Sequence, residues 1–316
     1  MRKQYLFLLS LLFTTFIFSQ ADTTKISFVA YWSVGDSYDF NVTKSTQQWK
    51  KNELTKDQKQ NYKAKFTVID STADTYTIKW SFENKIAESL AIPSYFKQEL
   101  TEFSNIEVIY KTSEVGDFLE IVNWEEISGV MTSTFDKILN LSSKVDDSKE
   151  MLNSILQPIK QIYSSKEGIE SLVLKEIQYF HFPMGLEYDI TVPIEYEEEI
   201  PNMFGGKPIK ANGIVHFEDV DIDGGFCVVK QELSLDPKDT NKMLQTIFKT
   251  MKLNNKELKN AFKNSNVTIN DTNIYEYYFY PGIPHRIETT RESNININNE
   301  DGKRIEKIII ELIYNE

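Results

Sequence analysis

Three aspartates at alternate positions form the sharpest motif in this sequence that could bind a ligand. Asp219, Asp221 and Asp223 are followed by a glycine, as in the first half of a calcium-binding loop, where alternate carboxylates converge on the ion. The match then ends, because the twelfth position of such a loop requires a bidentate glutamate and is Lys230 here. The residues between the aspartates are apolar, as in a strand that enters a hairpin. The motif therefore leaves a Ca²⁺ site open but favours an acidic hairpin tip.

The other candidate ligands and nucleophiles are scattered. His181, His216 and His285 have no His or Cys partner at the spacing of a zinc site. Cys227 is the single cysteine and lies in an apolar, strand-like run, so we expect a buried structural thiol and no intrachain disulfide. No nucleophile motif and no glycine-rich phosphate loop occurs. We therefore predict no catalytic residue, no metal ligand and no cofactor, and the sequence names no binding residue.

Carboxylates are too numerous to single out a hydrolase pair. The chain has 47 Asp and Glu residues, so any two chosen for a glycosidase-like mechanism would be arbitrary. The acidic run Glu197–Glu199 is most simply a solvated strand end. A hydrolase stays open as a third hypothesis, and it predicts a cleft that contains two groups of shifted pKa.

Most of the chain shows the period-two alternation of β-strands. Up to residue 122, apolar residues alternate with polar ones in five runs, and short polar turns join them. These expected strands are Tyr38–Val42, Tyr62–Val68, Tyr76–Phe82, Ile106–Tyr110 and Phe118–Val122. After residue 182 the alternation returns at Leu186–Tyr196, where Pro193 suggests an edge strand. Further strands are expected at 209–220, 226–235, 266–280, 285–297 and 303–314, with Asp301-Gly302 as the last turn.

Between these blocks the apolar period changes to that of helices. Three amphipathic stripes cover residues 127–139, 151–163 and 169–180. A further helix should begin after Asp236, which can cap it, with Pro237 suited to its first position. Short turns between successive strands imply antiparallel pairing. We therefore predict an α+β fold, with a curved antiparallel sheet or half-barrel and helices packed on one face.

Aromatic residues concentrate on the expected strands. Tyr275, Tyr277 and Tyr280 share one strand, and Trp80 and Tyr110 lie on others. If the sheet curls, its concave face would be large and apolar, and such faces hold hydrophobic ligands. The alternative is that the helical stripes cover this face as ordinary core.

The N-terminus predicts export from a bacterial cell. Arg2 and Lys3 precede the apolar run Tyr5–Phe18, and small or polar residues follow to Ala21, so residues 1–21 match a secretory signal peptide. Residues 22–316 should form a single soluble domain without a membrane span, in the periplasm or outside the cell, with two structural halves at about 22–182 and 183–316 that suggest duplication. The net charge of −12 disfavours nucleic-acid partners. The oligomeric state is not predicted.

The end of the chain resembles a known class of carriers. The segment Tyr280-Pro281-Gly282-Ile283-Pro284-His285-Arg286-Ile287-Glu288, followed by two long strands, is similar to the C-terminal part of exported half-barrel lipid or lipoprotein carriers. The resemblance implies a long antiparallel sheet with helices in its concavity, and it transfers no ligand residue. We therefore expect an exported, non-enzymatic protein that binds an apolar small molecule or an envelope component. A secreted interaction or scaffold protein, with a packed core and an exposed aromatic patch, is the alternative.

Overall fold

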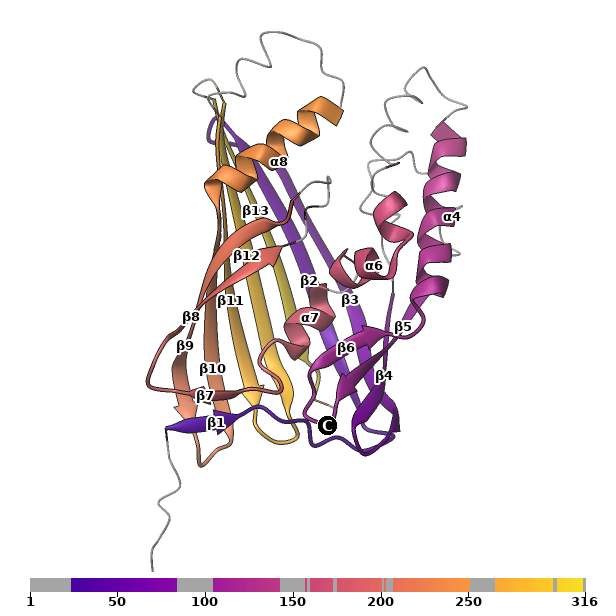
Figure 1. Ribbon diagram of the computed structural model, residues 1–316, viewed down its shortest axis with the longest axis vertical. Helices are drawn as coiled ribbons and strands as arrows, with labels where there is room; N and C mark the ends of the chain where they lie inside the picture. The colour runs from indigo at the N-terminus through magenta and orange to yellow at the C-terminus, as the bar shows by residue number, and fades with distance from the viewer. Residues whose placement is uncertain are drawn as a thin grey trace, which may run out of the picture.

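The expected alternation builds one eleven-stranded antiparallel sheet that curves without closing (Figure 1). The computed structural model describes residues 24–83, 105–142, 157, 160–172, 175–200, 202, 207–250, 265–297 and 300–314. The fold class predicted from the sequence is confirmed, since strands dominate and a few helices lie on the concave side. The expected signal peptide, residues 1–21, lies outside the described residues, as do most of the second helical stripe and the link after residue 250.

The strands fall into two runs along the chain. The first contains β2 (Ser37–Lys50), β3 (Glu53–Ser71), β4 (Thr75–Glu83), β5 (Asn105–Ser113) and β6 (Phe118–Ile121). The second contains β8 (Ile194–Ile200), β9 (Ile209–Asp221), β10 (Phe226–Leu235), β11 (Asn266–Tyr278), β12 (Ile283–Ile297) and β13 (Glu300–Leu312). Within each run, strands that follow one another in the chain pair with each other. The two runs join where β13 pairs with β2, so the N-terminal and C-terminal strands meet in the middle of the sheet.

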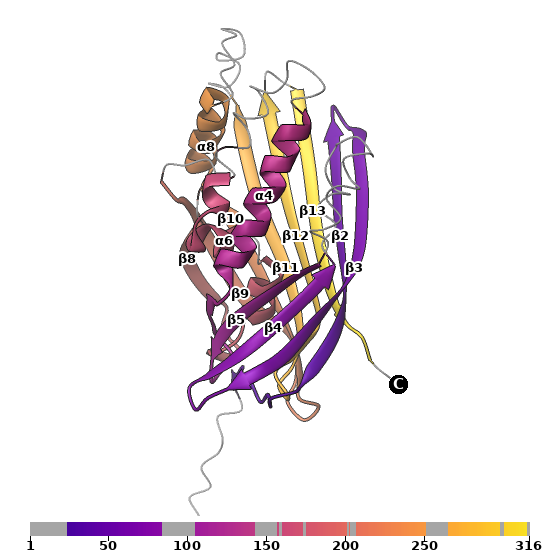
Figure 2. The ribbon, with the colours of Figure 1, turned by 90° about the vertical axis from the view of Figure 1, so that its right-hand side faces the viewer.

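Helices cover part of the concave side. The helix α4 (Trp124–Ser142) stands beside β5, and α6 (Lys166–Leu172) packs against α4 and β6. The helix α7 (Lys175–His181) lies in the hollow of the sheet and contacts β12, while α8 (Pro237–Thr250) packs on β9 and β11 (Figures 1 and 2). The expected stripe at 169–180 thus contributes two described helices, on either side of residues 173–174. Within the described chain, no helix combines the length and the apolar character needed to cross a membrane.

The cap of α8 confirms the predicted helix start. The Asp236 carboxylate accepts hydrogen bonds from the backbone N–H groups of Lys238 and Asp239, at 2.7 and 3.0 Å. These are two of the N–H groups that have no partner within a helix, and a side-chain cap satisfies them.

The main core lies at one end of the concave face, which we call the closed end (bottom of Figure 1). Here β1 (Lys25–Ser27) pairs with β7 (Glu187–Asp189) in a separate two-stranded sheet. The segment after β1 crosses this end and buries Phe28 and Trp32. Phe180 of α7 is fully buried and stacks on Phe66, with ring centroids 5.1 Å apart. The expected aromatic concave face is therefore real at this end, and α7 covers it as core.

The strand predicted at Leu186–Tyr196 is wrong as a single element. It divides into β7 and β8, with a turn between them, and the two belong to different sheets. The Asp189 carboxylate accepts hydrogen bonds from both the backbone N–H and the hydroxyl of Thr191, which is a local turn stabilised by a side chain. Pro193 follows this turn. The edge position that Pro193 suggested is confirmed, because β8 forms one edge of the large sheet.

One smaller expectation about a turn is also wrong. Asp301 and Gly302 lie within β13, opposite Asn296 and Ile295, and not in the turn before it. The strand extends beyond the apolar alternation there, because cross-strand pairing continues through polar residues. The proposed duplication of two halves remains a prediction.

Candidate functional site

The concave face changes from apolar to polar partway along five neighbouring strands. Near the closed end, one row across the sheet consists of Val42, Ile310, Ile287, Tyr275 and Val229, and all five side chains are buried. Two positions further along each strand, where side chains face the same side again, the row consists of Lys44, Ile308, Thr289, Asn273 and Gln231. The next row contains Thr46, Glu306, Arg291 and Asp271. Beyond the buried core of the closed end, the concave face thus carries a band of polar and charged residues.

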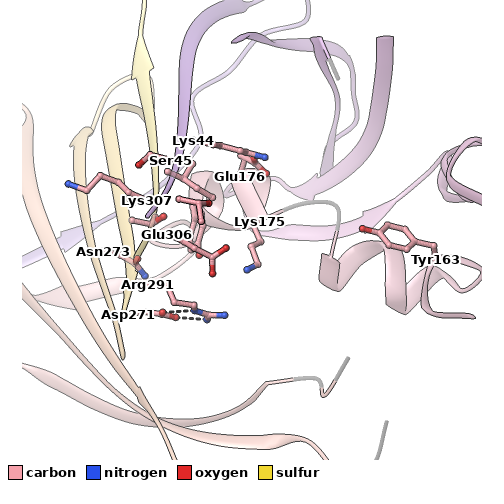
Figure 3. Close-up of a pocket in the computed structure, with 14 residues that line it drawn as sticks. Lys44, Ser45, Tyr163, Lys175, Glu176, Asp271, Asn273, Arg291, Glu306 and Lys307 are labelled. Atoms are coloured by element: carbon pink, nitrogen blue, oxygen red, sulfur yellow. Dashed lines mark hydrogen bonds and ion pairs between the residues drawn. The ribbon is translucent and has the colours of Figure 1, made fainter. Parts of the chain in front are cut away.

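Two adjoining chambers, which together we call the concave cavity, open over this band. The first has a volume of about 350 Å³ and lies among Lys44, Glu176, Arg291 and Tyr163 (Figure 3). The second has a volume of about 370 Å³ and extends toward α7 and β8. Both volumes are in the range of small-molecule sites. Five residues line both chambers and so mark their boundary: Lys175, Tyr179, Asp271, Asn273 and Arg291.

An ion pair between two strands anchors the floor of the cavity. The Asp271 carboxylate on β11 accepts two hydrogen bonds from Arg291 on β12, at 2.7 Å from Nε and 2.6 Å from an Nη atom. The side chain of Asp271 is only 6% exposed. The bidentate geometry suits a guanidinium and a carboxylate, and hydrogen bonding to Asp271 raises the pKa of Arg291. Each group therefore neutralises the other in a partly desolvated setting.

The other carboxylates of the first chamber are paired as well. Glu176, at the start of α7, forms an ion pair with Lys44 and accepts a hydrogen bond from the Tyr62 hydroxyl at 2.9 Å. Glu306 on β13 pairs with Arg304, with 2.7 Å between nitrogen and oxygen. Burial, and then the charge of Glu176, raise the pKa of Tyr62.

Three ionisable groups at the boundary and mouth of the cavity have shifted pKa values. Burial, and then the charge of Arg291, lower the pKa of Lys175. Burial, and then the charge of Asp271, raise the pKa of Tyr179 to about 12. Glu198 of β8 lies at the mouth of the second chamber, where partial burial and the nearby Asp271 raise its pKa. The acidic run Glu197–Glu199 is exposed, as expected for a solvated strand end, and Glu198 and Glu199 also border the second chamber.

A polar network fixes the wall of the second chamber. The Gln231 side-chain oxygen accepts hydrogen bonds from Asn273 at 2.8 Å and from the Tyr275 hydroxyl at 2.9 Å, and its amide group donates to the Tyr196 hydroxyl. Gly213 on β9 makes room for Tyr196, because a Cβ atom there would lie 2.2 Å from the tyrosine ring. A glycine within a strand is typical of such close approaches.

The aspartates singled out in the sequence do not join this cavity. Asp219, Asp221 and Asp223 are exposed around the β9–β10 hairpin, and Asp221 accepts a hydrogen bond from the backbone N–H of Gly224 at 2.8 Å. One carboxylate thus stabilises the turn itself. Among the described residues, no group of three or more His, Cys, Asp or Glu side chains is arranged to hold a metal ion.

The histidines and the cysteine lie apart from one another. His181 is buried between the Tyr110 hydroxyl and the carbonyl oxygen of Gly116, at 2.9 and 2.8 Å. His216 is near Glu218, and His285 contacts the Tyr314 hydroxyl at 2.7 Å. Cys227 is a buried free thiol, as expected, and burial raises its pKa to about 12.

Sequence reasoning missed every residue of the polar band. The sequence did contain a signal for this band. The inward positions of β11 are, in order, Tyr277, Tyr275, Asn273 and Asp271. Those of β12 are Ile287, Thr289 and Arg291. Alternation that continues while its inward residues turn polar indicates a strand that leaves the core and lines a polar space.

Comparisons with known proteins do not identify a family. No protein-family model matches the chain, and no curated protein matches it. One similar solved structure is Ail, the attachment invasion locus protein of Yersinia pestis, with 5% sequence identity and a TM-score of 0.15; the match covers 89% of this chain and 100% of that chain. A likeness at this TM-score carries no inference. The resemblance to half-barrel carriers stays a prediction, and the function must be argued from the geometry.

Proposed function

We propose that this chain is an exported protein of the cell envelope that binds an amphipathic envelope component in the concave cavity. The observation that carries the proposal is the cavity itself, built where the apolar concave face of the closed end changes to polar and charged residues. A stable core does not require charges in this position, since buried ionic groups are weak contributors to stability. Their presence on four adjacent strands is better explained by a ligand.

The lining of the second chamber supports a ligand with an apolar part. Phe182 stacks on Tyr275 with ring centroids 4.8 Å apart, and Leu233 and Ile200 continue this wall. The same chamber also carries Lys175, Arg291 and Glu198. A molecule with an apolar portion and a polar head would match both kinds of lining residue, and this refines the expectation of an apolar ligand.

The charges of the cavity favour binding over catalysis. A hydrolase was expected to show two groups of shifted pKa in a cleft, and Lys175 and Glu198 fit that description. Three of the remaining carboxylates are held by cations: Asp271 by Arg291, Glu176 by Lys44 and Glu306 by Arg304. The fourth, Glu199, is exposed at the border of the second chamber. A general base needs a carboxylate available for a proton, and these ion pairs oppose that role.

Native mass spectrometry of the protein from its host's envelope fraction tests the proposal. We expect a co-purifying mass of lipid size that is lost on organic extraction. Tryptophans at Thr46, which lines the first chamber, and at Leu233, which lines the second, should together fill the space and abolish this mass. The double variant Thr43→Trp and Ser234→Trp, on the same two strands, is the matched control, because the register places both residues on the opposite face. Circular dichroism should show that both variants are folded.

Two results would contradict the proposal. The first is a wild-type protein that carries no bound mass and gains none when incubated with envelope lipids. The second is a bound mass that persists equally in the double variant that fills both chambers and in its control, which would place the ligand outside the concave cavity.

An interaction protein is a second candidate, because two exposed tyrosines form a patch at the closed end. Tyr31 and Tyr280 are 53% and 75% exposed, and their ring centroids lie 5.6 Å apart. Exposed aromatic side chains of this kind are enriched at protein interfaces. A Tyr31→Ser and Tyr280→Ser double variant should then lose a partner that cross-links to the wild-type protein in intact cells. Unchanged cross-linking would exclude the patch as that interface.

A further inference from the structure

One cation that lines the concave cavity takes part in no ion pair among the described residues. The other three lining cations are paired: Lys44 with Glu176, Arg291 with Asp271, and Lys307 with Glu288. The lining carboxylate Glu306 is held by Arg304. Lys175, at the boundary of the two chambers, is the lining cation without such a partner, while Glu198 and Glu199 border the second chamber without an ion pair.

The ammonium group of Lys175 makes no hydrogen bond and no close ion pair in the described part of the chain, although the charges of Glu306, Asp271 and Glu176 act on it from a greater distance. No hydrogen bond joins it to another residue, and no carboxylate oxygen lies within 4.0 Å of it. Its side chain is half-buried and extends into the cavity in front of Arg291 and Asp271 (Figure 3). Holding a cation there costs free energy unless a negative group accompanies it.

A second polar group nearby is also unsatisfied. Asn273, on the boundary of the same chambers, is only 4% exposed. Its amide nitrogen donates to Gln231, but its oxygen Oδ1 is buried without a hydrogen-bond partner among the described residues. Buried polar atoms in native proteins are generally paired, and a bound ligand supplies a partner at sites where the protein does not.

We propose, building on the binding function above, that the ligand carries an anionic head group that pairs with Lys175 and also donates a hydrogen bond to Asn273. A carboxylate or a phosphate has the required charge, and a hydroxyl, amide or amine beside it supplies the donor. The paired cations Lys44, Arg291 and Arg304 hold the framework in place. The apolar part of the ligand then extends along Phe182 and Leu233.

Binding of three matched probes to the full exported chain tests this assignment. Decanoate, decyl phosphate and decanol share an alkyl chain and differ in the charge of the head group. Isothermal titration calorimetry below their micelle concentrations should show that at least one anion binds wild type about tenfold more tightly than Lys175→Met, the effect of a charged hydrogen bond. Decanol should bind both proteins equally. Whichever anion shows the difference distinguishes the carboxylate from the phosphate.

Two further variants make the result specific. Lys175→Arg keeps the positive charge and should retain anion binding within a few-fold of wild type. Lys63→Met removes an exposed lysine from the outward face of β3 and should bind every probe as wild type does.

The outcomes separate this inference from the proposed function. If decanol binds wild type and the anions bind wild type and Lys175→Met alike, the head-group assignment is overturned and the amphiphile site stands. If none of the probes binds wild type, both proposals fail. If Lys175→Arg loses anion binding as completely as Lys175→Met, the role of the charge is refuted.

Discussion

At the scale of a single residue, the buried carboxylate of Asp271 makes the stability of the fold depend on one ion pair. Its carboxylate is almost completely buried and depends on Arg291 for compensation. We expect Arg291→Met to lower the free energy of unfolding by about 3 kcal/mol, because it leaves a buried charge without its partner. Urea denaturation followed by circular dichroism measures this change.

The double variant distinguishes a lost ion pair from lost packing. Asp271→Leu combined with Arg291→Met removes both charges and should recover most of the stability, since apolar replacements of a buried pair are often neutral. If the double variant is as unstable as Arg291→Met alone, packing of the arginine stem and not the orphaned carboxylate is responsible.

Lys175 should lower the stability of the folded protein, whereas Arg291 raises it. Its pKa is lowered in the folded protein, so folding opposes the protonated form, and this penalty is present at all pH values below its ordinary range. We expect Lys175→Met to raise the free energy of unfolding at pH 7 by about 1 kcal/mol, as is common where function and stability conflict. The exposed control Lys63→Met should change it by less than about 0.5 kcal/mol. Thermal and urea unfolding of the apo proteins test this, and a destabilised Lys175→Met would contradict it.

At the scale of elements, α7 is held against the sheet by one buried histidine. The Gly116 carbonyl oxygen accepts a hydrogen bond from Nδ1 of His181, so Nε2 of the neutral ring accepts the Tyr110 hydroxyl hydrogen. Burial lowers the pKa of His181 to about 4. A protonated ring would lose its acceptor atom, and α7 would lose one of its attachments to the β5–β6 turn.

This arrangement predicts a pH-dependent stability. The unfolded protein binds a proton at His181 below about pH 6.5, whereas the folded protein does so only near pH 4, so stability falls as the pH decreases through this window. The contribution is about 3 kcal/mol and is fully present above pH 6.5. Because carboxylates also titrate there, we expect the stability difference between wild type and His181→Gln to decrease between pH 7 and pH 4.5. A constant difference across urea titrations in this range would refute the assignment.

Sequence patterns found the apolar portion of each strand and missed the polar portion. The alternation at Tyr38–Val42 predicted a short strand, but β2 continues to Lys50. Likewise β3 begins at Glu53, well before its first buried residue, Ala64. Hydrophobic alternation marks a strand only where one face is buried in apolar surroundings. Where inward residues line a polar cavity or face water, pairing with the neighbouring strand maintains the strand, and a single sequence does not show that pairing.

The same physical reason hid the candidate site. Lys175 lies within the apolar stripe 169–180 as an ordinary charged helix residue would, and Asp271 and Asn273 appear in an Asn-rich stretch. Only the register of β11 against β10 and β12 places their side chains together on one face. The three aspartates, which form the sharpest ligand-binding motif in the sequence, instead lie at an exposed hairpin, where one of them stabilises the turn.

At the scale of the whole molecule, an open sheet must protect its edges. The edges of the large sheet are β6 and β8, and an unpaired strand edge is a template for pairing with another chain. On β8, Glu195, Glu197 and Glu199 alternate with the inward residues Tyr196 and Glu198 and are exposed, and Glu199 also borders the second chamber. Charged residues on an edge strand oppose such pairing, so this acidic run has a role that is separate from the cavity residue Glu198.

We therefore expect Glu195, Glu197 and Glu199, when replaced together by threonine, to permit association through β8. Threonine favours strands and removes the repulsion between two acidic edges. Size-exclusion chromatography with light scattering should show concentration-dependent oligomers. The control changes Glu218 to Gln, and Asp219 and Asp223 to Asn, which removes three negative charges at the exposed β9–β10 hairpin. If both triple variants behave alike, net charge and not the edge governs association; if only the β8 variant associates, the acidic edge is what keeps this open sheet from extending into a second copy.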